Sequence, residues 1–237
     1  MSSRLIRLYL LIFSSAWLSS PVSAVESATA VRLIYQEYEQ GVEPYQVSYT
    51  ISGEHMRIDD ATDQSGFIVF DSKEQKIFSV SHFDKSILVM ANSAPTQLSA
   101  EFKIDIEYKQ IEDAPKIAGR SVYNFRVKAV TDTSSERCMD IQLVPGLLPQ
   151  AVAILQSFQR VVSAQQVTNL GKTPEELRTP CYLVDQVYNT GEYYNKGLPI
   201  QEWHSNGRIR RLLNFEKTEV DTTIFNLPAD YRQFSLQ

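Results

Sequence analysis

Three histidines, His55, His82 and His204, are the side chains best suited to general-base catalysis or metal binding. None of them lies in an H-x-x-x-H or H-E-x-x-H spacing, which would place two imidazoles on one metal ion. Ser121 could act as a nucleophile beside a histidine and an aspartate, but the sequence lacks the G-x-S-x-G turn that exposes such a serine. We therefore expect the histidines to be strand or turn residues and the protein not to be an enzyme.

An acidic cluster, Asp59, Asp60 and Asp63, could suggest a calcium site. Its spacing lacks the glycine and the distal glutamate of a calcium-binding loop, so we expect a solvated turn. No sequence motif points to a cofactor, and we expect none.

Three arginines, Arg208, Arg210 and Arg211, surround or follow an Asn-Gly turn late in the chain. Alternation along a strand places Arg208 and Arg210 on one face and Arg211 on the other, so the three cannot form a single anion-binding clamp. We expect a solvated strand with acidic neighbours. Tyr193 and Tyr194 lie in a polar loop between two glycines, where they either pack locally or form an exposed contact for a partner.

The two cysteines, Cys138 and Cys181, belong to no C-x-x-C redox pair and lack nearby histidines that would complete a zinc site. In an oxidising compartment such an isolated pair is best explained by one disulfide. Closing a loop of about 44 residues would stabilise the fold by roughly 4 kcal/mol in the chain-entropy model.

The first 24 residues have the three parts of an export signal. Arg4 and Arg7 provide a positive start, residues 8–17 are apolar apart from two serines, and residues 22–24 (Val-Ser-Ala) suit cleavage before Val25. The apolar run is shorter than the roughly 20 residues of a membrane span. We expect residues 1–24 to be a cleaved signal peptide, the mature protein to be periplasmic without a transmembrane anchor, and residues 25–237 to form one domain.

The composition is that of a globular protein, with 43% apolar and 22% charged residues among 237. Without Arg4 and Arg7 the chain has 21 basic and 28 acidic side chains, a net charge of about −7. This charge argues against nucleic acid and anionic lipid headgroups as partners.

Apolar and polar residues alternate with a period of two over most of the remaining chain, which is typical of half-buried strands. The gaps between these runs permit hairpins but not the crossovers of a parallel sheet, so we expect an antiparallel meander. Asn206–Gly207 is the strongest hairpin signal. The predicted strands are residues 45–52, 56–58, 67–70, 77–80, 87–90, 102–109, 123–129, 139–143, 182–188, 198–203, 209–215 and 222–227.

One segment, residues 149–166, instead repeats apolar residues at helical spacing and predicts an amphipathic helix that begins at Pro149. Thr173 and Pro174 predict the start of a short second helix. A sheet of some eleven strands must curl or close. We therefore expect an α+β fold: a curved antiparallel β-sheet, forming a half-barrel of about 11 strands, with both helices on its concave side.

Four segments occur in a suggestive order: residues 53–59 (Gly-Glu-His-Met-Arg-Ile-Asp), 66–71 (Gly-Phe-Ile-Val-Phe-Asp), 117–120 (Ile-Ala-Gly-Arg) and 225–231 (Phe-Asn-Leu-Pro-Ala-Asp-Tyr). With the export signal before them, they resemble the periplasmic lipoprotein-carrier superfamily, the half-barrel fold of outer-membrane lipoprotein-sorting proteins. The chain is similar to a looser branch of that superfamily. The resemblance implies an incomplete barrel with helices at its mouth and an apolar cavity for acyl chains.

Periodicity and this resemblance together predict a hydrophobic ligand beneath the main helix. We expect a periplasmic carrier or sensor that binds an acyl chain or another apolar group, in lipid or lipoprotein handling. In the alternative, the interior is filled and the protein is an interaction or regulatory module that docks an envelope protein. The residues expected to line the cavity are Phe102, Ile104, Ile106, Tyr108, Tyr123, Phe125, Ile154, Leu155 and Phe158.

Overall fold

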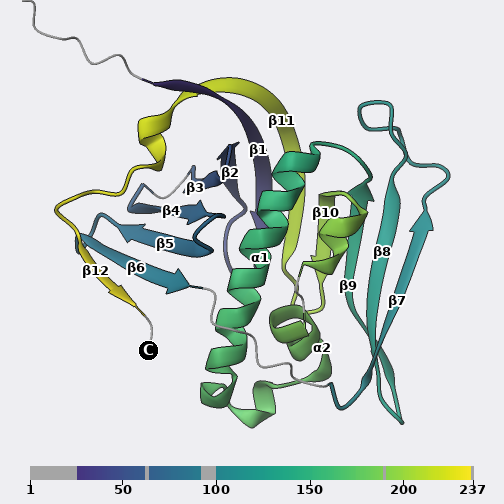
Figure 1. Cartoon of the computed structure of the whole chain (residues 1–237). Helices are drawn as coiled ribbons and strands as arrows, with labels where there is room; N and C mark the ends of the chain where they lie inside the picture. Colours follow the sequence, from purple (N-terminus) through teal and green to yellow (C-terminus); the bar gives the residue numbers. More distant parts are fainter. Residues whose placement is uncertain (1–25, 62–63, 92–99, 189–190, 236–237) are drawn as a thin grey trace, which may run out of the picture.

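The computed structural model describes residues 26–61, 64–91, 100–188 and 191–235 (Figure 1). The expected signal peptide and its cleavage site, like Asp63, lie outside these residues. Within the described part of the chain, twelve strands form one open sheet. They are β1 (Ser27–Tyr38), β2 (Tyr45–Ser52), β3 (His55–Asp60), β4 (Gly66–Asp71), β5 (Lys76–Ser81), β6 (Ser86–Ala91), β7 (Lys103–Gln110), β8 (Tyr123–Val130), β9 (Ser135–Val144), β10 (Leu198–His204), β11 (Ile209–Asp221) and β12 (Arg232–Ser235).

The order of the strands across the sheet is β12-β6-β5-β4-β3-β2-β1-β11-β10-β9-β8-β7. Every neighbouring pair is antiparallel except β12 and β6, which run parallel, so the sheet is mixed rather than purely antiparallel. β1 lies in the middle, paired with β2 on one side and β11 on the other. β1 and β11 are long and bend together over the molecule (Figure 1). The expected α+β class with a curved sheet is confirmed.

The helical part is α1 (Pro149–Asn169), the short α2 (Pro180–Leu183) and a π-helical turn, Val184–Tyr188, that continues α2. The 3-10 turns are Leu170–Lys172, Glu175–Leu177, Glu192–Lys196 and Thr222–Phe225. No helix in the residues described here combines the length and apolarity that crossing a membrane requires.

Two predicted strands, residues 182–188 and 222–227, are wrong, since both segments are largely helical. β1 and β12 were not predicted. The expected number of strands agrees with the observed one only because two missed strands offset two wrongly predicted ones. The short helix predicted from Thr173 is present as a single 3-10 turn, Glu175–Leu177, with Pro174 rather than Thr173 at its N-cap, and α2 is a further helix that was not predicted. Thr179 caps α2 by accepting a hydrogen bond from the backbone N–H of Tyr182, with Pro180 in the first turn.

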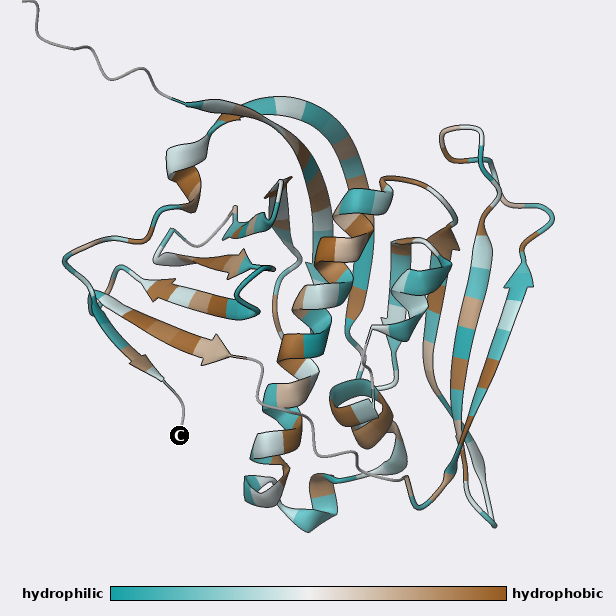
Figure 2. Cartoon of the chain, viewed as in Figure 1, coloured by the Kyte–Doolittle hydropathy of each residue, from teal (hydrophilic) through white to brown (hydrophobic). Residues whose placement is uncertain are grey.

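The core lies between α1 and one face of the sheet, which we call the inner face. Figure 2 shows apolar and polar residues alternating along β7, β8 and β9, and the inner positions of the central strands, such as Leu33, Phe70 and Ile141, are fully buried. α1 contacts β5 and β6, and Phe158 packs edge-on against Phe70 with ring centroids 5.6 Å apart. Leu155 of α1 is 2% exposed.

Candidate functional site

An apolar cavity of about 220 Å³ lies on the inner face beside the edge strand β7. Along each strand every second side chain points to the inner face, so the cavity is lined by alternate residues of the neighbouring strands. Its opposite side is formed by the helical segments that follow α1, from α2 to the 3-10 turn Glu192–Lys196, which we call the wall. The lining residues are Ile104, Ile106, Phe125, Val127, Met139, Val184, Tyr188, Glu192 and Tyr193.

The helical wall is fixed to the sheet by the disulfide between Cys138 and Cys181, which confirms the predicted pairing. Cys138 is the extra residue of a β-bulge, because Val127 of β8 pairs with Met139 while the next residue pairs with Arg137. The bulge lets both Cys138 and Met139 face inward, which places Cys138 against Cys181 of α2. The wall is therefore covalently joined to the strand that floors the cavity.

The structure brings three of the nine predicted ligand-binding residues to this cavity: Ile104, Ile106 and Phe125. Tyr108 and Tyr123 stack on each other beyond it, with centroids 5.0 Å apart and rings tilted by 14°. Two of the predicted ligand-binding residues on β7 are largely open to solvent, Ile106 at 53% and Tyr108 at 37% exposed. Among the described strands β7 lies at the edge of the sheet, so no further strand flanks these side chains there.

The other predicted residues pack elsewhere. Leu155 belongs to the buried core, and Ile154 and Phe158 are half-buried against that core. Phe102 packs edge-on against Tyr188 with centroids 6.0 Å apart. The apolar face of α1 thus fills the inner face of the sheet, and the cavity lies beside the wall segment rather than beneath α1.

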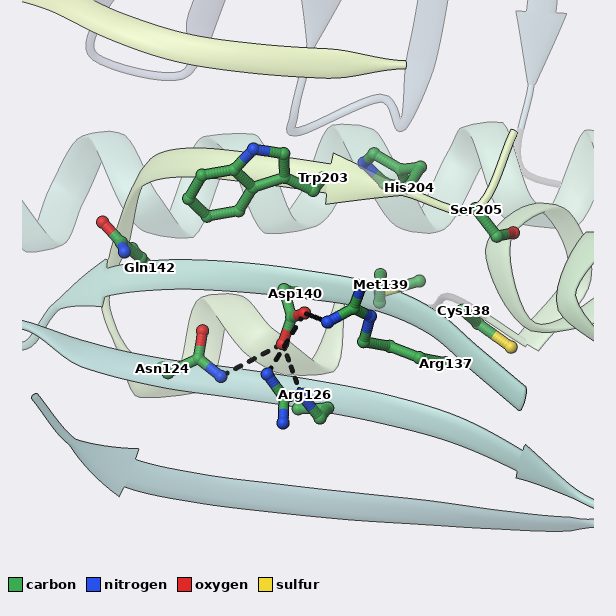
Figure 3. A pocket seen from close by; sticks show the side chains of 10 residues that line it. All are labelled: Asn124, Arg126, Arg137, Cys138, Met139, Asp140, Gln142, Trp203, His204 and Ser205. Carbon is green, nitrogen blue, oxygen red and sulfur yellow. Dashed lines mark hydrogen bonds and ion pairs between the residues drawn. The ribbon is translucent and has the colours of Figure 1, made fainter. Parts of the chain in front are cut away.

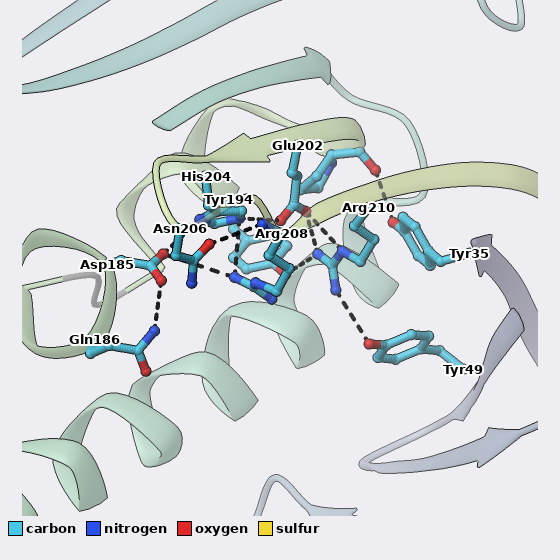
Figure 4. Close-up of polar contacts among 11 residues, drawn as sticks. Tyr35, Tyr49, Asp185, Gln186, Tyr194, Glu202, His204, Asn206, Arg208 and Arg210 are labelled. Carbon is cyan, nitrogen blue, oxygen red and sulfur yellow. Dashed lines mark hydrogen bonds and ion pairs between the residues drawn. The ribbon is translucent and has the colours of Figure 1, made fainter. Parts of the chain in front are cut away.

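A buried polar cluster lies on the other side of the wall, between β10 and β11 (Figure 4). Arg210 and Glu202 form an ion pair at its centre, with the Arg210 Nε 3.0 Å from a Glu202 oxygen. Arg210 also donates to the hydroxyls of Tyr49 and Tyr194, each at 3.3 Å. Its guanidinium lies 4.6 Å from the centre of the Tyr35 ring.

Electrostatics hold this central pair ionised. Burial would raise the pKa of Glu202, but Arg210, helped by His204 and Arg208, outweighs it and lowers the pKa to about 2. Glu37, opposite Arg210 in the β1–β11 pairing, shows the reverse balance, because burial dominates and raises its pKa. The cluster therefore combines a firmly ionised carboxylate with one that is easier to protonate.

His204 connects the cluster to the wall. Its Nδ1 lies 2.6 Å from Asp185 of the π-helical turn, and its Nε2 lies 3.0 Å from an Arg208 nitrogen. Burial lowers the pKa of His204, but its bonds to Asp185 and Glu202 outweigh that effect and raise it. His204 is buried and paired with two carboxylates, and it thereby links β10 to the wall.

The prediction of a solvated arginine strand is wrong for Arg210, which is only 7% exposed. Two other parts of that prediction are confirmed: Arg210 has acidic neighbours, and Arg211 lies on the opposite, exposed face of the strand. Tyr193 and Tyr194 pack locally, both buried. The roles of Glu202 and Asp185, and the contacts of Arg210 with Tyr49 and Tyr194, were not predicted from the sequence. The hairpin loop has three residues, 205–207, with Gly207 at positive φ, and it places Glu202 opposite Arg210; a two-residue Asn-Gly turn would have placed Trp203 there.

In the described residues, no group of three or more histidine, cysteine, aspartate or glutamate side chains is arranged to hold a metal ion. Asp59, from the cluster considered for calcium, instead pairs with Arg57 at 2.7 Å.

Comparison with known proteins gives little further information. No family model matches the chain, and no curated protein matches it. Two crystal forms of PNGF-II show a likeness: the C2 form has a TM-score of 0.41 and 11% identity over 88% of this chain and 31% of that chain. The P21 form has a TM-score of 0.42 and 10% identity over 88% and 32%. The chain thus spans less than a third of the length of that protein.

Proposed function

We propose that the protein is a non-catalytic carrier or sensor of the periplasm that takes an apolar group, such as the end of an acyl chain, into the cavity beside β7. The observation that carries the proposal is an apolar cavity whose rim includes Ile106, a large aliphatic side chain left 53% exposed. Exposed apolar surface that continues into a cavity favours a ligand.

The size of the cavity limits the ligand. At about 220 Å³ it is smaller than the roughly 300–1,000 Å³ of pockets for drug-sized molecules. It therefore suits one end of an acyl chain, with the remainder lying along the exposed apolar side chains of β7. Each buried methylene contributes about 0.8 kcal/mol.

The resemblance to a branch of the lipoprotein-carrier superfamily supports the same proposal, and the disulfide is compatible with export to an oxidising compartment. The packed inner face favours a second candidate, an envelope interaction module in which β7 and the cavity accept an apolar side chain of a partner protein. The two candidates differ in whether a free acyl chain binds.

The test is titration of the delipidated protein with a fluorescent fatty-acyl probe. We expect saturable binding, and weaker binding by Ile106→Glu, which places a charge on the rim without disturbing the core. Leu177→Glu is the matched control, because Leu177 is 56% exposed and does not line the cavity. Absence of saturable binding, or equal loss in both variants, would refute acyl binding and leave the interaction module.

A further inference from the structure

A second hollow, of about 560 Å³, lies on the opposite, outer face of β8, β9 and β10 (Figure 3). The strand registers order its side chains in rows. Trp203 pairs with Asp140, and Asp140 pairs with Arg126, so these three side chains cross the sheet in one row. Gln142 and Asn124 form the adjacent row. The hollow is thus floored by one indole and several planar polar groups.

The charges in this hollow do not cancel. Asp140 accepts a hydrogen bond from Arg126 at 2.7 Å and from the Asn124 amide at 3.1 Å, and it pairs with Arg137 at 3.3 Å. Arg126 also lies opposite Glu107 of β7, and Arg137 lies opposite Lys128 of β8, so basic side chains outnumber acidic ones here by three to two. The Arg137 side chain is 65% exposed, whereas that of Asp140 is 13% exposed. The protein as a whole carries a net charge of −5, so this hollow is a locally positive site that favours an anion.

The hollow continues into a neighbouring one of about 400 Å³ that shares Gln142. This extension adds Gln201, Arg211 and the exposed Leu213, and it passes under the segment that includes Pro115. Because Gln142 lines both, the two hollows adjoin, and we call them together the groove.

The chemistry of the groove favours a saccharide over a peptide. β8 and β9 are paired on both sides, and so are residues 201–203 of β10, so an extended peptide finds no free strand edge here. Side-chain amides and guanidinium groups instead suit hydroxyls and carboxylates, and the Trp203 indole offers an apolar plane for a sugar ring. We infer that this groove binds an anionic oligosaccharide, a function separate from the apolar cavity.

The experiment is isothermal titration of the full chain with tetragalacturonate, a carboxylated oligosaccharide. We expect saturable binding that weakens as salt is raised, because Arg137 contributes through its charge. Trp203→Ala and Arg137→Ala should each weaken binding by about tenfold or more, as expected for a lost charged hydrogen bond or aromatic plane. Arg32→Ala is the matched control, because Arg32 makes a similar ion pair with Glu216 at 3.5 Å and lines neither hollow.

Two further titrations exclude the alternatives. Maltotetraose, a neutral saccharide, should bind at least about tenfold more weakly than tetragalacturonate, and tetraglutamate should show no saturable binding. The inference is overturned if tetragalacturonate does not bind, if the neutral sugar or the acidic peptide binds equally well, or if Arg137→Ala has no more effect than Arg32→Ala. Because Arg137 is largely exposed, that variant keeps the test valid even if Trp203→Ala fails to fold, which circular dichroism will show.

Discussion

Replacing Glu202 by glutamine tests whether the buried cluster stabilises the fold as an ion pair. The substitution keeps the size of the side chain but leaves the Arg210 guanidinium, only 7% exposed, without its carboxylate. Removing one partner of a buried pair costs about 3–5 kcal/mol, because the remaining charge stays buried and uncompensated. We expect Glu202→Gln to lower the free energy of unfolding at pH 7 by that amount.

The pH dependence gives a second, independent estimate. The pKa of Glu202 is lowered from 4.5 to about 2 in the folded protein, a difference equivalent to about 3 kcal/mol. Because the folded pKa lies below the unfolded one, this stabilisation is fully present above pH 4.5 and is lost as the pH falls toward 2. The stability difference between the parent and Glu202→Gln should therefore shrink over the same interval.

The assay is urea unfolding followed by circular dichroism between pH 7 and pH 2.5. Glu216→Gln is the control on β11, because its partner Arg32 is exposed and such surface pairs contribute about 1 kcal/mol or less. A second variant, Glu202→Leu with Arg210→Met, should recover most of the lost stability, since it removes both charges. The reasoning is refuted if Glu202→Gln costs no more than Glu216→Gln, or if its cost is the same at every pH.

Three further substitutions test the fold. Cys138→Ser with Cys181→Ser should lower the free energy of unfolding by roughly 4 kcal/mol, measured by the urea midpoint, because the closed loop spans 43 positions; an unchanged midpoint would contradict the loop argument. Gly66→Ala should lower the melting temperature, because its new Cβ would lie 2.0 Å from a backbone oxygen of β5, whereas Gly171→Ala, with open space around it, should not. Leu155→Ala should cost about 2–5 kcal/mol by leaving a cavity in the core, and a cost below 1 kcal/mol would mean that α1 is not packed as described.

Alternation of residue types predicted strands such as β2, β7 and β8 well, because these strands keep their apolar residues on one face. It missed β1, whose inner face ends in the polar Glu37 and whose outer face carries Ile34, so that its pattern is mixed. Residues 182–188 were misread because their apolar residues fit either period. The Thr179 cap and the disulfide at Cys181, both just before that segment, favour a helix.

The candidate site could be predicted only in part. Alternation correctly placed Arg208 and Arg210 on one face. A two-residue Asn-Gly turn would put Trp203 opposite Arg210, whereas the loop has three residues, 205–207, and Glu202 lies there instead. Burial of Arg210 depends on Tyr49, 161 positions earlier in the chain, and on Tyr35, which comes earlier still. No local pattern carries that information, because it arises only when the central strands meet.

The central position of β1 affects how the chain folds while it is being synthesised. Ser27 pairs with Asp221 and Tyr38 with Ile209, so the middle of the sheet joins the two ends of the sequence. At synthesis rates of about 5–20 residues per second, β1 waits roughly 10–40 seconds for its partner strand to emerge. During that interval one edge of a future central strand is open to pairing with other chains, and contacts of such long range also slow folding. A holding chaperone that covers this first segment would increase the yield of native protein more than one that acts on any later strand.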